Sequence, residues 1–315
     1  MIIDKNNKKS IRSAFGKALS EIGELNSKIV VMDADLSCST QTQIFAKKFP
    51  ERFFNSGIAE QDMIATAAGL ASEGKIPFVS SFAMFVTGRT YDQIRNSVCY
   101  PEFNVKIVGT HGGITVGEDG ASHQALEDIS LMRSIPHMTV IVPADSKECE
   151  EVIKYAALHD GPMYIRIARS NVPDVFGDDY HFNIHKAYLM EEGTDVSIFT
   201  NGETLAEVLG AVEILKHEGI SAEVIHVPVV KPLDIETVIA SVKKTNFAIT
   251  VENHSVIGGL GSAVCEALCG YYPAKVYRIG IHDEFGQSGE ASELLDYYGL
   301  TSETLAKRIK SKLKD

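Results

Sequence analysis

The sequence contains no tryptophan and only five cysteines among its 315 residues. The cysteines are odd in number and scattered, which is typical of a reduced protein and not of a disulfide-bonded one. No apolar run approaches the roughly 18 residues of a membrane-spanning helix, and the first residues have no apolar core of signal-peptide length. We therefore expect a cytoplasmic protein that does not act in a membrane.

Positive charge is also scarce: the sequence has 30 Lys and Arg residues and 42 Asp and Glu residues, so its formal net charge is −12. This balance argues against nucleic acid or an anionic membrane as a main partner. An anionic substrate would need a local cluster of positive charge.

Several motifs of other enzyme classes are missing. There is no Walker-type Gly-Lys-Ser/Thr segment, no zinc-spaced set of Cys and His, and no nucleophile elbow. Cys265 and Cys269 lie four residues apart on a predicted helix. They could be two metal ligands, but small apolar residues around them favour an ordinary helix face, and we predict no metal ligand in the chain.

Apolar strands alternate with helices along the whole sequence, and the length suits two domains with separate cores. Residues 1–9 are polar, and we expect them to be frayed. The first series of predicted elements comprises helices over 10–25, 60–73, 84–99, 125–134 and 145–158, and strands over 28–33, 52–54, 76–80, 104–109, 138–142 and 163–167. The second comprises strands over 195–200, 222–228, 247–252 and 275–280, and helices over 203–218, 234–243 and 258–269.

This alternation predicts mostly parallel sheets covered on both faces, that is, two three-layer α/β domains. Residues 171–188 lose the periodicity and collect Pro, Gly and Asp, as expected of a domain boundary. We predict domains over 1–175 and 191–315, joined by a linker over 176–190.

A polar turn around Glu60 is the best candidate for a functional site. Residues 55–63 follow a short aromatic strand and open a helix of small residues. Open α/β sheets place ligands at such strand-to-helix turns. The bare motif also allows a structural role, because a carboxylate in the first turn stabilises a helix. A second glycine turn, at Gly258, Gly259 and Gly261, could bind an anion, although close helix packing explains such glycines more often.

Three stretches together resemble the transketolase family of thiamine-diphosphate enzymes. They are the turn Gly57-Ile58-Ala59-Glu60-Gln61, the glycine-rich loop from Thr110 to Gln124, and the segment from Arg166 to Pro173. Their order and spacing are family-like. The resemblance covers nearly the whole chain and implies a pyrimidine-binding domain followed by a transketolase C-terminal domain.

The resemblance implies that Glu60 activates the cofactor. Family members use a buried glutamate that shares a proton with the aminopyrimidine ring. Phe82 and Phe85 match the aromatic pocket for that ring, and Ile58 belongs to the same turn. The two phenylalanines could instead be core residues at a helix start. Where the family usually has a third aromatic ring, this chain has Gly88.

The same resemblance assigns the substrate contacts. His123, as a catalytic residue, and Asp119 match residues near the reacting carbon, since a histidine can donate to a developing alkoxide. A loop that merely holds its own shape is the alternative. Arg169 and His111 match phosphate contacts, for which planar charged donors suit best. The matches of Ser39 and Arg12 are less close, and Arg12 could equally be a solvated helix residue.

The Gly-Asp-Gly segment with which the family binds the diphosphate and a divalent metal is absent from this sequence. The resemblance therefore implies the C-terminal subunit of a split transketolase, inactive alone. A separate N-terminal subunit would hold Mg²⁺ or another divalent ion, within an α2β2 heterotetramer in which this chain self-associates.

Three other functions remain open at this point. The β subunit of a 2-oxo acid dehydrogenase has the same two domains, but not normally His111, Asp119, His123 and Arg169 together. A deoxyxylulose-phosphate-synthase-like carboligase has a similar glutamate turn and a segment like Tyr91-Asp92-Gln93, but is normally one long chain. A non-catalytic, cofactor-binding or regulatory partner would have no chemical need for Glu60.

Overall fold

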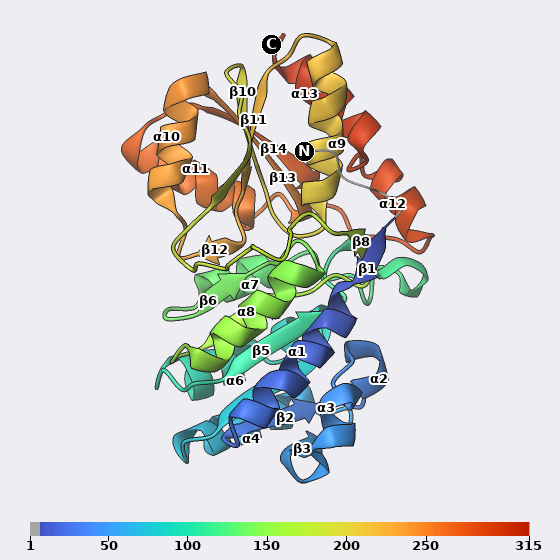
Figure 1. Cartoon of the computed structure of the whole chain (residues 1–315), viewed down its shortest axis with the longest axis vertical. Coiled ribbons are helices and arrows are strands. Elements are labelled where there is room, and N and C mark those ends of the chain that lie inside the picture. The colour runs from blue at the N-terminus through green and yellow to red at the C-terminus, as the bar shows by residue number, and fades with distance from the viewer. Residues whose placement is uncertain (1–6, 315) are drawn as a thin grey trace.

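Two β-sheets organise the chain in a computed structural model that describes residues 7–314, and the two halves are stacked along the long axis in Figure 1. This confirms the predicted α/β class with two domains. The first sheet has the order β12 (Val229–Lys231), β6 (Thr139–Ile141), β7 (Met163–Arg166), β5 (Lys106–Thr110), β4 (Ile76–Phe82), β2 (Ile29–Asp33) and β3 (Phe53–Asn55). The second has the order β14 (Lys275–Ile281), β13 (Phe247–Ser255), β10 (Val196–Thr200), β11 (Ala222–His226) and β9 (Tyr188–Glu191).

Helices cover both faces of the first sheet, because its parallel strands are apolar on both sides. Phe78 and Val79 of β4 show the alternation, since they belong to the cores on opposite faces. One face carries α1 (Ile11–Leu25), α3 (Gln43–Lys48) and α8 (Ser146–Leu158), of which α1 and α8 lie in front in Figure 1. The other carries α4 (Glu60–Ser72), α5 (Ala83–Gly88), the π-helix η2 (Ile94–Cys99) and α7 (Asp128–Ser134).

The second sheet is built in the same way. Ile198 and Phe199 of β10 point into separate cores on its two faces. One core includes α9 (Thr204–His217), α12 (Ala291–Tyr297) and α13 (Ser302–Lys312), and the other includes α10 (Ile235–Thr245) and α11 (Leu260–Tyr271).

The two halves are joined by more than the chain connection. Strand β12 comes from the second half of the sequence, yet it pairs antiparallel with β6 at the edge of the first sheet. The predicted strand over 222–228 is therefore wrong at its end: β11 stops at His226, and the chain crosses to the other sheet from Val229.

A buried ion pair lies where the halves meet. Arg166 Nε donates to Asp128 Oδ2 over 2.8 Å, and both side chains are almost completely buried. Arg166 Nη2 donates to the carbonyl oxygens of Ala125 at 3.2 Å and of Asn253, on β13, at 2.9 Å. The Tyr164 hydroxyl donates to the same oxygen of Asp128 over 2.6 Å. Arg166 is thus a structural residue that connects the two domains.

The predicted continuous helix over 84–99 is wrong. The chain instead forms α5, a short turn α6 (Tyr91–Gln93) and the π-helix η2. Gly88 ends α5, and the hydroxyls of Thr87 and Thr90 donate to the carbonyls of Ala83 and Val86, over 2.7 and 2.5 Å. Such back-bonding competes with the helical pattern.

Sequence reasoning missed several elements: α2 (Ser37–Thr40), α3, α12, α13, the 3-10 turn η1 (Pro50–Arg52), and the β1 (Lys8–Ser10) and β8 (Asn171–Pro173) pair. The prediction that residues 1–9 are frayed is therefore wrong for Lys8 and Lys9, which lie in β1. Most of the other residues of that segment lie outside the described range. Within residues 7–314, no helix is long and apolar enough to cross a membrane.

Candidate functional site

Glu60 lies at the first position of α4, directly after the turn that follows β3. Gly57 has φ +69°, a conformation that suits glycine, and its amide is held by Asn55 Oδ1 at 3.0 Å. The Glu60 side chain is only 1% exposed. Among the described residues, its carboxylate hydrogen-bonds with the Ser81 hydroxyl (3.1 Å, Oε1) and Arg89 Nη1 (2.8 Å, Oε2), not with the amides of α4. The carboxylate therefore makes no capping hydrogen bond to α4 within the described part of the chain.

An aromatic cluster stands beside this carboxylate. Phe82 ends β4 and Phe85 lies in α5, with ring centroids 5.9 Å apart and an interplanar angle of 14°. The His111 ring stacks on Phe82 at 3.8 Å, and the His123 ring meets Phe85 edge-on at 5.2 Å. The structure thus brings both predicted phenylalanines together with both predicted histidines.

Arg89 is a member of this cluster that sequence reasoning missed. Besides its ion pair with Glu60, its guanidinium carbon lies 4.8 Å from the centroid of the Phe85 ring. The available signal was its position four residues after Phe85, because residues at this spacing share a helix face.

Residues from the second half of the chain hold the glycine-rich loop from Thr110 to Gln124 in place. The loop contains the 3-10 helix η3 (Ile114–Asp119), whose first amide donates to Asn253 Oδ1 over 3.0 Å. Thr115 Oγ1 donates to Glu203 Oε1 over 2.7 Å, and burial raises the pKa of that glutamate. Gln124, at the end of the loop, donates to the carbonyl of Gln287 over 2.9 Å. The loop is fixed from outside and does not rely on its own side chains alone.

The two histidines and Asp119 differ in their surroundings. His111 is buried, with Nδ1 2.9 Å from the Thr110 hydroxyl. Burial, followed by the charges of Arg12 and Arg169, lowers the pKa of His111 to about 3, so its ring is neutral near neutral pH. His123 is partly exposed, whereas Asp119 is exposed at the end of η3, and no hydrogen bond or ion pair of the described residues joins it to either histidine.

Positive charge collects around His111, although the chain as a whole is acidic. Arg12, half-buried on α1, donates to the carbonyl of Ser39 over 2.7 Å, and its buried Nε has no partner among the described residues. Burial and the charge of nearby Arg169 lower the pKa of Arg12. Arg169 also hydrogen-bonds with the carbonyl of Val116 and, at 2.9 Å, with Glu118. Arg12 is therefore not an ordinary solvated helix residue, and these side chains could hold an anion.

Other predicted positions lie outside the ring cluster. Ile58 is 80% exposed on the surface next to Glu60. Among the described residues, a Cβ atom at Gly88 would meet only the Met84 methyl group, at 3.4 Å, so no aromatic ring takes the place of the third one here. The Tyr91 hydroxyl is hydrogen-bonded to Ser134 at 2.9 Å.

The amides of the glycine turn before α11 already bind a carboxyl group of the chain itself. Glu252 Oε2 accepts from the amide of Leu260 at 2.7 Å, and Oε1 accepts from that of Gly261 at 2.8 Å. Burial raises the pKa of Glu252 to about 7. Cys265 and Cys269 are free thiols, and no group of three or more His, Cys, Asp or Glu side chains within residues 7–314 could hold a metal ion.

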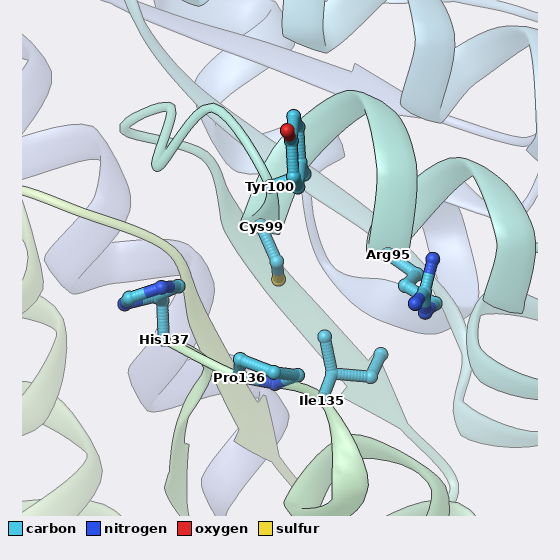
Figure 2. A pocket seen from close by; sticks show the side chains of 6 residues that line it. All are labelled: Arg95, Cys99, Tyr100, Ile135, Pro136 and His137. Carbon is cyan, nitrogen blue, oxygen red and sulfur yellow. The ribbon is translucent and has the colours of Figure 1, made fainter.

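A pocket of about 220 Å³ lies apart from this site, between η2 and the turn after α7 (Figure 2). None of the predicted site residues lines it. Its lining side chains are Arg95, Cys99, Tyr100, Ile135, Pro136 and His137.

Comparison with known proteins covers most of the chain. Residues 7–175 match the family "Transketolase, pyrimidine binding domain", and residues 185–305 match "Transketolase, C-terminal domain". A Methanocaldococcus jannaschii protein provisionally named a transketolase C-terminal section is 51% identical over 97% of both chains. The 6-deoxy-6-sulfo-D-fructose transketolase subunit SqwH of a Clostridium species is 41% identical, over 94% of this chain and 92% of that protein. A solved structure titled "Split gene transketolase, inactive beta4 tetramer" superposes with a TM-score of 0.89 at 47% identity, over 98% of this chain and 99% of that one.

Proposed function

Because this chain belongs to the transketolase family, as the C-terminal subunit of a split enzyme, we propose that it takes part in ketol transfer. Together with an N-terminal subunit, it moves a two-carbon ketol unit from a ketose phosphate to an aldose phosphate. The family depends on thiamine diphosphate, which supplies the nucleophilic carbon that attacks the substrate carbonyl when it is bound.

The observation that carries the proposal is the buried carboxylate of Glu60 beside stacked rings. Glu60 is nearly inaccessible, and Phe82 and Phe85 form an aromatic surface next to it. A planar, hydrogen-bonding heterocycle such as the aminopyrimidine fits this combination, since the rings offer stacking and the carboxyl group can hold or share a proton at Oε2. Ile58 contributes apolar surface beside the same group.

The loop and the basic cluster would bind the two ends of a sugar phosphate. His123, next to Phe85, would exchange a proton with a substrate hydroxyl, and the exposed Asp119 would accept a hydrogen bond from another hydroxyl. Arg169 and Arg12 supply permanent positive charge for the phosphate. His111 is neutral and contributes a hydrogen bond, and Ser39 lies against Arg12 at the same end.

A partner chain completes the site in this proposal. The sequence carries no Gly-Asp-Gly segment, and the described residues contain no metal-ligand cluster. The N-terminal subunit would therefore hold Mg²⁺ and the diphosphate in an α2β2 complex. The relative titled as an inactive β4 tetramer supports both self-association of such chains and inactivity without a partner. The five free cysteines fit a cytoplasmic enzyme.

The identity of the sugar is a separate question. One relative is named for 6-deoxy-6-sulfo-D-fructose, a sugar that bears a sulfo group. We propose a pentose phosphate as the first substrate class to test. The relatives carry transketolase names, which favours ketol transfer over 2-oxo acid decarboxylation, a deoxyxylulose-phosphate-like condensation or a non-catalytic role.

The proposal is tested with a coupled assay of the chain mixed with its N-terminal partner, thiamine diphosphate and Mg²⁺. Xylulose 5-phosphate and ribose 5-phosphate are the substrates, and each chain alone is the control. We expect activity only in the mixture, and we expect Glu60→Gln to slow thiamine C2 proton exchange in the assembled complex. Decarboxylation of 2-oxo acids without ketol transfer, or unchanged exchange in Glu60→Gln, would contradict the proposal.

A further inference from the structure

Arg89 occupies the place between Glu60 and the aromatic cluster. Its Nη1 atom donates to Glu60 Oε2 over 2.8 Å, and its guanidinium lies over the Phe85 ring at 4.8 Å. The side chain is 46% exposed, whereas that of Glu60 is almost completely buried. One side chain from the rim of the site thus reaches inward to both groups.

These two contacts are those that an aminopyrimidine would need. A guanidinium is planar, bears hydrogen-bond donors in its plane, and stacks on aromatic faces. An aminopyrimidine is also planar and would use the Phe85 face and the Glu60 carboxyl group. Since Ser81 already donates to Oε1, Oε2 is the oxygen that remains for the ring, and Arg89 holds it.

We propose that Arg89 is an internal stand-in for the aminopyrimidine, which closes this site until the cofactor displaces it. The inference rests on the proposed function, because it assumes that Glu60 and Phe85 receive the cofactor. Arg89 would then control how tightly the cofactor binds, and it would not itself be a catalytic residue. Its exposure gives the displaced guanidinium a direct path into water.

The test is the affinity of the assembled two-chain complex for thiamine diphosphate, measured by isothermal titration calorimetry in Mg²⁺. Arg89→Ala removes the competitor, so the cofactor no longer has to break one partly exposed ion pair and one cation–π contact. We expect the dissociation constant for thiamine diphosphate to fall roughly three- to thirtyfold. Arg95→Ala is the matched control, because Arg95 is exposed on η2 and hydrogen-bonds to Asn96. An unchanged or higher dissociation constant in Arg89→Ala would overturn the inference.

Chemical rescue separates competition from a structural effect. Methylguanidine added to the Arg89→Ala complex should weaken cofactor binding toward the wild-type value and should affect the wild-type complex less. No effect of methylguanidine would overturn the stand-in role. If Arg89→Ala does not assemble, Arg89→Gln serves in both measurements with the same expected directions.

Failure of the inference can be told apart from failure of the proposed function. A wild-type complex that binds no thiamine diphosphate would refute both. A wild-type complex that binds the cofactor and transfers ketol units, while Arg89→Ala fails to bind it more tightly, would refute the inference alone.

Discussion

Replacing Arg166 with methionine should lower the free energy of unfolding by about 3–5 kcal/mol, the usual cost of leaving one partner of a buried ion pair alone. Methionine keeps most of the apolar stem but removes the guanidinium. That group provides three hydrogen bonds, to Asp128 and to the carbonyls of Ala125 and Asn253. All three acceptors lie at the junction of the two halves.

The surroundings of Asp128 offer little compensation. After the substitution, the Tyr164 hydroxyl remains as a donor to Oδ2, while Oδ1 already has no hydrogen-bond partner among the described residues. His254 Nε2 lies 3.9 Å from Oδ1, but burial lowers the pKa of His254 to about 4, so it carries no charge near neutral pH. The carboxylate would therefore be buried and uncompensated.

Urea unfolding at fixed protein concentration measures the effect in Arg166→Met, in Asp128→Asn and in the double variant Asp128→Asn/Arg166→Met. The double variant removes the stranded charge, so it should be more stable than the sum of the single substitutions predicts, by about 0.5–3 kcal/mol. Lys310→Ala is the control, because its pair with Glu218, at 2.9 Å, is about 40% exposed on both sides. Such surface pairs contribute about 0–1 kcal/mol.

Two results would refute this reasoning. One is a loss in Arg166→Met no larger than that in Lys310→Ala. The other is strict additivity in the double variant, which would mean that Arg166 and Asp128 stabilise the chain independently.

Three further predictions concern the site. Arg169→Ala should raise KM about tenfold or more for phosphorylated substrates, with less effect on unphosphorylated analogues, because one charge-assisted contact is lost; an equal effect on both would make Arg169 structural. Because the pKa of His111 is lowered to about 3, its ring should not titrate between about pH 5 and 8. The pH dependence of KM in this range should therefore have the same shape in the wild type and in His111→Asn. A titration step that is present in the wild type and lost in the variant would contradict this. Gly113→Ala should lose about 1–3 kcal/mol in urea unfolding, because Gly113 has φ +81° and a Cβ atom would clash with the Asn253 amide. Gly161→Ala, at φ +109° with open space around it, should lose less, and equal losses would rule out the clash.

The sequence predicts those parts of the site that depend on local order. Glu60 directly follows a strand and a glycine turn, so periodicity and turn chemistry predict its place at the carboxyl edge of the sheet. The partners of its carboxylate do not follow in this way. Ser81 and Arg89 are distant in sequence, and they reach Glu60 only because β4 and α5 pack beside α4.

The missed elements have similar physical reasons. Helix α13 is rich in lysine, and its buried apolar residues Leu305, Ala306 and Ile309 form a stripe too narrow to stand out in the sequence. The hydroxyls of Thr87 and Thr90 bond to the preceding turn at the break between α5 and α6, which the apolar pattern of residues 84–99 does not reveal. The pairing of β12 with β6 joins residues far apart in the chain, and each strand is only three residues long.

That pairing bears on how the chain can be divided. A fragment that ends near residue 175 would lack β12, and β6 would then become the outer strand of the first sheet with a row of unpaired amide and carbonyl groups. Exposed strand edges of this kind recruit other strands and promote aggregation. The first domain should therefore aggregate when it is expressed alone. A fragment of the same length that carries residues 229–231 on a short linker should remain soluble. Recombination between relatives would likewise have to exchange β6 and β12 together, although they belong to different halves of the gene.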